Sequence, residues 1–269
     1  MKILKLFFVV FVSTFHLNSW AQSSSAPSSL YPESFIEAYK SNQLKDQDLL
    51  LQLHKFEEKN HITIGYEKAK DYIFGYLYLE KLSNQQYAVT DVYCERQYTD
   101  QDFGQMTLGP MKSPQSGDVI NTEHTWPQSE FTSSFPKEMQ KSDLHHLFPT
   151  DSKMNGARSN YHFGDVTQTD KKLNCPTAEL GTDGVSRGII FEAPFKHKGN
   201  VARALFYFAS RYNLKIDSQE EKYLRQWNLS DPVDVNEKNK NDEIQKIQGN
   251  RNPFIDFPDL VDHIATFGQ

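Results

Sequence analysis

The chain has 269 residues, with 29 Lys or Arg, 35 Asp or Glu and a formal net charge of −6. This length suits one large domain or two small ones. The acidic total argues against a protein that coats nucleic acid through bulk positive charge, although it is compatible with an enzyme that has a locally positive cleft.

The N-terminus has the layout of a secretory signal peptide. Lys2 and Lys5 accompany an apolar run over residues 4–15, and small residues follow around Ser19 and Ala21. The run is too short to span a bilayer comfortably, and an amphipathic or core helix, the alternative, would not explain the charged start. We expect cleavage after Ala21, which removes two lysines and changes the net charge from −6 to −8. The mature chain is then expected to be secreted or periplasmic, without membrane association.

The chain after the leader is expected to begin with a flexible segment and helices. Residues 22–31 are rich in Ser, Pro and Ala without an apolar period, which is typical of a flexible lead-in. Apolar residues over 33–58 fall at helical spacing with an interruption near Asn42, which predicts one or two helices, and residues 66–78 continue in the same manner. The folded domain is expected over residues 32–269.

A strand is predicted from Thr90, where TDVYCERQYTD is rich in β-branched and aromatic residues and leads into a polar loop. This segment contains Cys94, and the second of the two cysteines is Cys175. In an exported protein such a pair can form a disulfide. Two buried free thiols are the alternative, whereas a cysteine-based metal site is disfavoured because no CxxC spacing is present.

The middle of the chain, residues 104–188, is dense in Gly, Pro, Asn, Asp, Ser and Thr, with short β-like runs. Long irregular stretches inside a compact domain are usually functional, so we expect the chemistry here. The segment also holds four histidines: His124, His145, His146 and His162.

Helices return toward the C-terminus. Residues 201–214 carry an apolar face, and Ser218 is expected to cap a helix running to Trp227, with Glu221 as its capping-box partner. Asp231–Pro232 is expected to start another helix. The sequence therefore predicts a single mixed α+β domain that is mostly helical.

Three interpretations compete for the polar side chains of the middle segment. A zinc site could use His124, His145 and His146, because zinc favours imidazole ligands. Adjacent histidines rarely point at one metal, however, and no HExxH motif puts two imidazoles on one helix face. In the second interpretation the histidines, in particular His145, His146 and His162, are structural.

The third interpretation is phosphodiester hydrolysis with one histidine and a hard cation. A neutral imidazole, here His124, can take a proton from water near neutral pH. Mg²⁺ prefers oxygen ligands and usually takes one or two from the protein, which Glu123 and Asn155 can supply. Arg158 can then hold a phosphate oxygen in bidentate fashion.

Backbone geometry restricts this third interpretation. Glu123 and His124 would face opposite sides of a regular strand, so both reach one centre only if the strand ends, twists or bulges there. Trp126–Pro127 favours an ending, because Pro cannot continue a ladder. Asn155 would have to come from a short helix in SKMNGARSN. The required arrangement is a strand, a second strand and a helix around one metal.

Four segments in order resemble the bacterial endonuclease I family: EHTWPQS, DLHHLFPTDSKMNGARSN, FEAPFKHKGNVARALFYFASRY and IQGNRNPFIDFPDLV. The match runs from about Tyr66 to Ile264. The EH pair alone would be weak, but together with NGxRSN it is specific. Members are secreted or periplasmic nucleases with a ββα-metal (His-Me finger) core, so the resemblance implies that core here.

The resemblance also implies residue roles. It makes His124 the general base and Glu123 and Asn155 the ligands of Mg²⁺, with Mn²⁺ or Ca²⁺ as substitutes. Members cleave DNA, and often RNA, with little sequence preference and leave 5′-phosphates, so DNA and RNA are the expected substrates. No obligate protein partner is indicated. The alternatives are a non-catalytic nucleic-acid-binding protein on the same fold and a zinc hydrolase of another phosphoester.

The chain departs from the family in its cations. Some relatives carry an arginine between the EH pair and the DLH segment that supports the cleaved phosphate, but this chain has no arginine over residues 97–157. Arg158 and Lys153 are the expected nucleic-acid contacts, and Lys141 and Lys137 are further candidates for the missing cation. Some relatives are also rich in disulfides, whereas this chain can form one.

Two further expectations concern polar residues that support the site instead of contacting the substrate. Arg158 could be structural instead, paired with Asp143 or Asp165. Asp143 and His145 are expected to brace the metal-site loop from behind its ligands.

Overall fold

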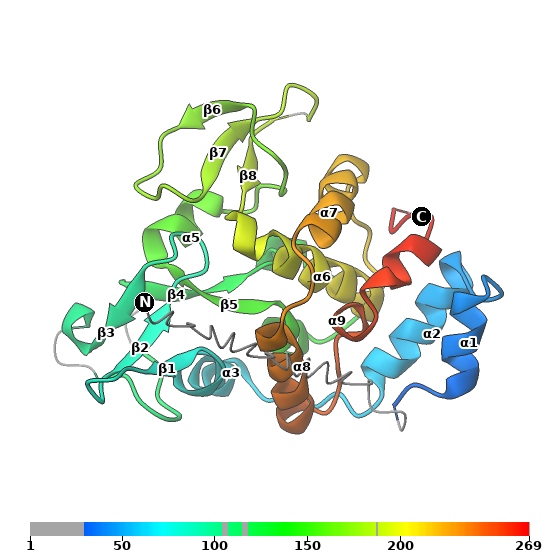
Figure 1. Cartoon of the computed structure of the whole chain (residues 1–269), viewed down its shortest axis with the longest axis horizontal. Coiled ribbons are helices and arrows are strands. Elements are labelled where there is room, and N and C mark those ends of the chain that lie inside the picture. Colours follow the sequence, from blue (N-terminus) through cyan, green and yellow to red (C-terminus); the bar gives the residue numbers. More distant parts are fainter. Residues whose placement is uncertain (1–29, 104–106, 115–117, 187, 269) are drawn as a thin grey trace, which may run out of the picture.

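The structure, a computed structural model, describes these residues: 30–103, 107–114, 118–186 and 188–268. The expected leader at 1–21 therefore lies outside the described residues, as does nearly all of the lead-in at 22–31. Helices and small antiparallel sheets alternate along the described part, which confirms a mixed α+β domain (Figure 1).

Two helices open the described chain, as the spacing of apolar residues predicts. They are α1 (Glu33–Lys40) and α2 (Asp46–Glu58), and Asn42 lies between them in the left-handed region with φ 57°. Asn tolerates that conformation better than most residues, so the helical pattern breaks there. α3 (Tyr66–Tyr72) follows and continues as a π-helical turn over Ile73–Leu77.

The first sheet has three antiparallel strands: β1 (Leu79–Lys81), β2 (Tyr87–Thr90) and β3 (Gln97–Thr99). The strand expected from Thr90 is wrong, because Thr90 ends β2 and a turn separates it from β3. The Asp91 carboxylate accepts hydrogen bonds from the backbone N–H groups of Tyr93 and Cys94, at 3.1 and 2.7 Å. Such local bonds favour a turn over an extended ladder.

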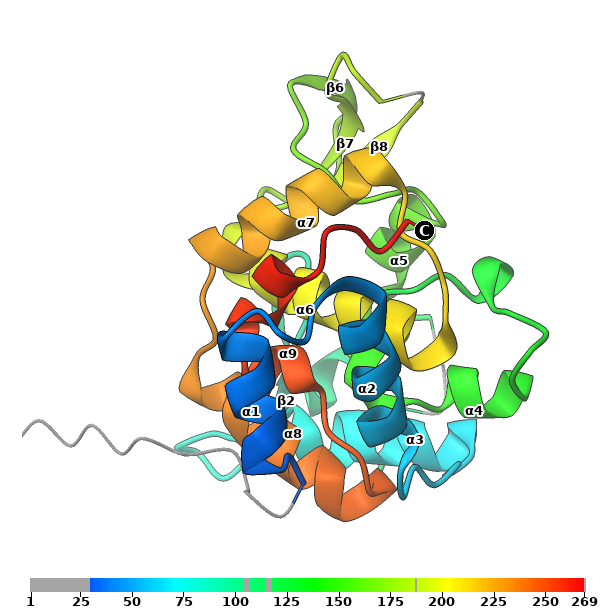
Figure 2. The ribbon, with the colours of Figure 1, turned by 90° about the vertical axis from the view of Figure 1, so that its right-hand side faces the viewer.

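The middle segment contains the elements that matter for the site: β4 (Ile120–His124), α4 (Lys137–Lys141), β5 (Leu147–Asp151) and α5 (Ser152–Arg158). Short 3₁₀ turns at Gln128–Glu130 and Leu144–His146 lie in the connection from β4 to β5. A third sheet follows, in the order β6 (Gln168–Lys171), β7 (Glu179–Thr182) and β8 (Ile190–Glu192), and it projects from one end of the molecule (Figures 1 and 2).

Four helices form the C-terminal part: α6 (Phe195–Tyr212), α7 (Ser218–Ser230), α8 (Val235–Gln248) and α9 (Pro253–Asp256). The expected cap of α7 is wrong by one residue, because Asp217 accepts two backbone N–H bonds at its start. The helix expected at Asp231–Pro232 begins later, capped by Asp234. Asp231 is instead bound to the start of α6, where it accepts the Gly199 N–H at 2.9 Å.

α6 is the central element of the core. α7 and α2 cover it on different sides (Figure 2), and most of its residues are buried. Trp126 is buried and stacks on Phe208 of α6, with ring centroids 5.5 Å apart. Since Trp126 lies two residues beyond β4, this contact fixes the end of that strand against the core.

Candidate active site

β4 and β5 form an antiparallel hairpin with α5 directly after it. The register pairs Glu123 with Phe148 and His124 with Leu147, and no bulge interrupts it. α5 starts at once because the Asp151 carboxylate accepts the N–H groups of Lys153 and Met154, as a helix cap does. The predicted order of strand, second strand and helix is therefore present.

The Glu–His pair at the end of β4 faces two environments. Glu123 contacts Tyr93 and Arg158, whereas the His124 ring lies beside Tyr66, 5.4 Å between centroids, and beside His146. Opposite directions are what a regular strand imposes on neighbours. The strand ends at His124, as predicted from the Trp–Pro pair that follows.

Glu123 is buried, and the contacts of its carboxylate with the described residues involve only one of its two oxygens. Its side chain is 1 % exposed, and Oε1 accepts the Tyr93 hydroxyl at 2.8 Å and lies 3.2 Å from Arg158 Nη1. Burial raises the pKa of this carboxyl, against the opposing effects of the Arg158 charge and the Tyr93 hydrogen bond. Within the described part of the chain Oε2 accepts no hydrogen bond, so it remains available for a ligand.

Asn155 is the second expected metal ligand, and α5 places it alongside β4. Its Nδ2 donates to the Thr122 carbonyl at 3.1 Å. This bond orients the amide, and among the described residues no donor reaches its Oδ1. Glu123 and Asn155 thus each contribute one oxygen without a partner, and carboxylate and amide oxygens are the ligands that a hard divalent cation prefers.

His124 is buried and held in one tautomer. Nε2 lies 3.1 Å from the Lys141 carbonyl oxygen, which can only accept, so Nε2 carries the proton of the neutral ring. Nδ1 faces the Gln128 amide nitrogen at 3.3 Å and is the basic atom. Burial lowers the pKa of His124 to about 4, and the Lys141 and Arg158 charges act in the same direction. The imidazole is therefore neutral near pH 7.

Arg158 lies inside the protein, with its side chain 2 % exposed. Nη2 donates to the Thr125 carbonyl at 2.6 Å and Nη1 to the His124 carbonyl at 3.2 Å. Its ion-pair partner is Glu123, not the Asp143 or Asp165 considered from the sequence. These contacts join the end of β4 to α5, and they give no support to a phosphate-holding role. Lys153, by contrast, is exposed in the first turn of α5.

Asp143 and His145 lie behind the hairpin in a hydrogen-bonded cluster. The buried Asp143 carboxylate accepts four bonds, from the His145 backbone N–H, the Gln248 amide and the Tyr207 and Tyr212 hydroxyls. Burial by itself would raise the pKa of Asp143, but the neighbouring imidazoles and the Gln248 amide lower it well below the usual range. These bonds fix the turn over Leu144–His146 that leads into β5.

The zinc interpretation is not supported by the side-chain directions. His145 donates from Nε2 to the Asn250 carbonyl and packs on Tyr207, whereas His146 packs on Phe208 and His124. The two adjacent imidazoles thus point apart. Within the described residues, no group of three or more His, Cys, Asp or Glu side chains could hold a metal ion.

Two side chains that were not predicted from the sequence, Gln128 and Tyr93, also contact the Glu–His pair. Gln128 stands four residues after His124, and its position in the EHTWPQS motif was the available signal. Tyr93 gave no such signal, because it lies thirty positions from Glu123 along the chain. Its backbone carbonyl accepts the Thr177 hydroxyl at 2.7 Å, next to the Cys94–Cys175 disulfide, which is present.

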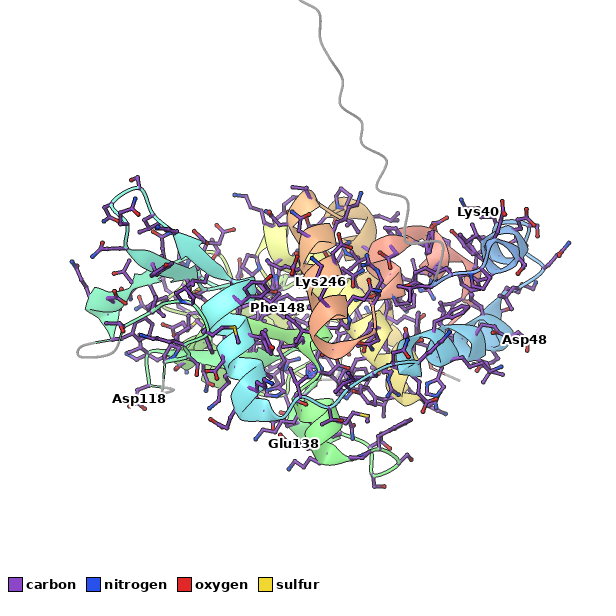
Figure 3. All side chains as sticks on the ribbon, turned by 90° about the horizontal axis from the view of Figure 1, so that it is seen from below. Lys40, Asp48, Asp118, Glu138, Phe148 and Lys246 are labelled. Carbon is purple, nitrogen blue, oxygen red and sulfur yellow. A yellow bond between two sulfur atoms is a disulfide. The ribbon has the colours of Figure 1, made fainter. Side chains whose placement is uncertain are left out.

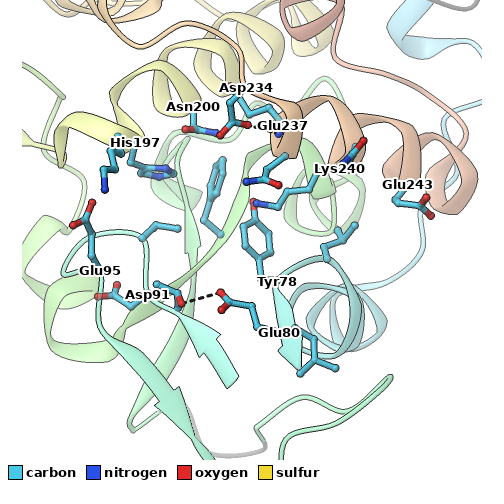
Figure 4. Close-up of a pocket in the computed structure, with 18 of the residues that line it drawn as sticks. Tyr78, Glu80, Asp91, Glu95, His197, Asn200, Asp234, Glu237, Lys240 and Glu243 are labelled. Carbon is cyan, nitrogen blue, oxygen red and sulfur yellow. Dashed lines mark hydrogen bonds between the residues drawn. The ribbon is translucent and has the colours of Figure 1, made fainter. Parts of the chain in front are cut away.

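A cavity of about 580 Å³ lies away from these residues, between the first sheet, the start of α6 and α8 (Figure 4). Its carboxylates make it unsuited to phosphate: Glu80, Asp91, Glu95, Asp234, Glu237 and Glu243. It approaches the hairpin through Phe148 of β5, which lies centrally in the molecule (Figure 3). We therefore place the candidate site at the end of β4 and not in this cavity.

In the part of the chain that the structure describes, no helix is both long enough and apolar enough to cross a membrane.

The family model of endonuclease I matches residues 51–259. An extracellular ribonuclease of Bacillus subtilis (strain 168) is 34 % identical over 165 residues, covering 54 % of this chain and 53 % of the relative. One from Bacillus amyloliquefaciens is 35 % identical over 176 residues, covering 57 % of each chain. A periplasmic deoxyribonuclease of Aeromonas hydrophila is 33 % identical over 118 residues, covering 43 % of this chain and 48 % of the relative.

The matched regions of these relatives amount to about half of their own length. The family model, in contrast, extends over most of this chain and includes β4, β5 and α5 with all the residues of the candidate site. The chain therefore belongs to the endonuclease I family.

Proposed function

We propose that this chain is an exported endonuclease that hydrolyses phosphodiester bonds of DNA and RNA with little sequence preference. Relatives named as ribonucleases and deoxyribonucleases support the reaction class. The observation that carries the proposal is the state of His124. Its ring is neutral, its Nε2–H is bound to a backbone carbonyl, and its Nδ1 is oriented to accept a proton.

In the proposed reaction, His124 Nδ1 takes a proton from a water molecule that attacks phosphorus in line with the leaving group. A new P–O bond forms, the bond to the 3′-oxygen breaks, and that oxygen takes a proton from solvent. The product ends are then a 5′-phosphate and a 3′-hydroxyl. The Lys141 carbonyl keeps its bond to Nε2–H throughout, so it orients the ring and stabilises the imidazolium.

Mg²⁺ fits the unpartnered oxygens of this site, and we propose that Glu123 Oε2 and Asn155 Oδ1 hold it, with Mn²⁺ or Ca²⁺ as substitutes. When bound, the ion supplies positive charge beside the phosphate and the leaving oxygen. Neighbouring hydrogen bonds and an ion pair orient these two side chains before the ion binds. Tyr93 and Arg158 hold the other oxygen of Glu123, and Thr122 holds the amide nitrogen of Asn155.

Cleavage of supercoiled plasmid and of RNA in Mg²⁺ tests the proposal, with EDTA expected to stop both reactions. His124→Ala should lose about 10²–10⁴-fold in rate, the usual contribution of a general base. The matched control is His162→Ala, which removes an imidazole that is 45 % exposed and faces Glu220, not Glu123. Product ends that accept a new 5′-label only after phosphatase treatment would identify 5′-phosphates.

Two results would contradict the proposed function. One is wild-type protein that cleaves neither substrate in any divalent cation while still binding nucleic acid. The other is folded His124→Ala protein that cleaves as fast as His162→Ala. Export has a separate test, since N-terminal sequencing of protein recovered from outside the cytoplasm should begin at Gln22.

A further inference from the structure

Phosphodiester hydrolysis needs a cation near the attacked phosphate in addition to a base, because negative charge builds up on its oxygens. Arg158 is committed to Glu123 and to the backbone carbonyls at the end of β4, and it is buried. Since these contacts hold the strand end, any side-chain cation that adds to the charge of the proposed Mg²⁺ has to come from another residue.

Lys141, the last residue of α4, borders the His124 ring twice. Its carbonyl accepts the imidazole Nε2–H at 3.1 Å. Its ammonium lies 4.1 Å from the centroid of the Tyr66 ring, and that ring is 5.4 Å from the His124 ring. The Lys141 charge is also one of the two cationic charges that lower the pKa of His124.

The ammonium of Lys141 is positioned to bind an anion such as a phosphate group. In the described part of the chain it forms no ion pair, and its side chain is only partly buried. Lys70 lies over the same Tyr66 ring at 5.3 Å, but it is paired with Glu67 at 2.9 Å. An ammonium above a ring face keeps N–H groups for a phosphate oxygen, so the ring can position the charge without neutralising it.

α3 and α4 hold this arrangement together. The backbone N–H of Tyr66 donates to the Glu138 carboxylate at 2.6 Å, which joins the start of α3 to α4. Glu138 is exposed and lies at the periphery of the molecule (Figure 3), so the junction of α3 and α4 is close to the surface. A nucleic acid strand can therefore approach Lys141 from the side of this junction.

We propose that Lys141 is a catalytic residue that holds a non-bridging oxygen of the scissile phosphate while His124 activates the water. The inference rests on the proposed function. Lys141 then stabilises charge in the transition state, and its removal should lower kcat more than it raises KM.

The test compares Lys141→Met with Lys68→Met in the full mature chain with Mg²⁺. Lys68 is exposed on α3 and makes the matched control, because its substitution changes the net charge by the same amount. We expect Lys141→Met to lose about 10²-fold or more in kcat, as for other preorganised charge-stabilising groups. Lys68→Met should stay within about twofold of wild type, and Lys141→Arg should recover part of the loss.

Inorganic phosphate gives a second readout that a merely structural lysine would not change. Phosphate should inhibit wild type and Lys68→Met equally, and Lys141→Met about tenfold more weakly. If Lys141→Met is unfolded by circular dichroism, Lys141→Gln replaces it with nearly the same length and no charge. Folded variants with wild-type kcat and unchanged phosphate inhibition would overturn the assignment, whereas inactive wild-type protein would overturn the proposed function itself.

Discussion

Arg158 joins three oxygens at the end of β4: the Glu123 carboxylate and the carbonyls of His124 and Thr125. Arg158→Met would leave these oxygens without their donor and the carboxylate without its countercharge. Breaking a buried ion pair from one side costs about 3–5 kcal/mol, so we expect that loss in the free energy of unfolding, measured by urea denaturation.

Two controls separate this effect from a general loss of charge. Lys153→Met, an exposed cation on the same helix, should change stability by less than about 0.5 kcal/mol. Adding Glu123→Gln to Arg158→Met should restore part of the loss, because it removes the unpaired buried charge. Arg158→Met protein as stable as wild type would show that the guanidinium contributes little to the strand end.

At the residue scale, sequence and structure agree best where a motif places chemistry at short range. Residue types, spacing and the family resemblance single out Glu123, His124 and Asn155, and the fold brings all three to β4 or beside it. The burial of Arg158 could not be predicted, because it depends on how closely α5 packs on the strand. The same holds for Tyr93, whose hydroxyl reaches Glu123 only after the first sheet and the hairpin assemble.

At the scale of elements, the Cys94–Cys175 disulfide ties the turn between β2 and β3 to the segment before β7, at a sequence separation of 81. A loop of this length corresponds to about 4–5 kcal/mol in the chain-entropy account. The Cys94→Ser/Cys175→Ser variant should lose stability of that order. Thermal unfolding with and without reductant is the measurement, and wild type in reductant should approach the variant. A double variant as stable as oxidised wild type would contradict this prediction.

The helices were predicted better than the strands, for a physical reason. α1, α2 and α6 carry apolar faces at the helical period over about two to five turns, and burial of those faces determines them. The strands are three to five residues long, so local side-chain bonds outweigh the weak period. The Asp91 carboxylate accepts backbone N–H groups and stabilises a turn where a strand was expected. The Asp231 carboxylate accepts an N–H group of α6 instead of capping the helix expected after it.

On the scale of the whole molecule, several imidazoles are buried and neutral. Burial lowers the pKa of His145 to about 4 and that of His197 to about 3, and it holds the pKa of His146 well below its ordinary value. In the unfolded chain these groups titrate near 6.5. Between about pH 6.5 and the folded pKa the unfolded state binds more protons, so the contribution of these histidines to stability is fully present above pH 6.5 and is lost as the pH falls.

His197 offers a direct test of this acid sensitivity. Its ring packs edge-on against Phe148, 4.7 Å between centroids, and its buried Nε2 has no partner among the described residues. His197→Phe should preserve the packing and remove one proton-binding site. Between pH 6 and 4 its unfolding free energy should fall less steeply than wild type, by about 1.4 kcal/mol per pH unit. His162→Phe, at an exposed position, is the control. A His197→Phe protein whose unfolding free energy falls with pH as steeply as that of wild type would contradict this prediction.

The disulfide has a consequence for chain integrity that goes beyond stability. The proposed base, the proposed metal ligands and Lys141 all lie between Cys94 and Cys175, inside one covalently closed ring. Exposed residues around Ser133, between His124 and α4, are natural targets for proteases. A single cut there would open the ring but could not release either half of the chain. The nicked protein would stay one molecule, separating into two pieces only when a reductant is added.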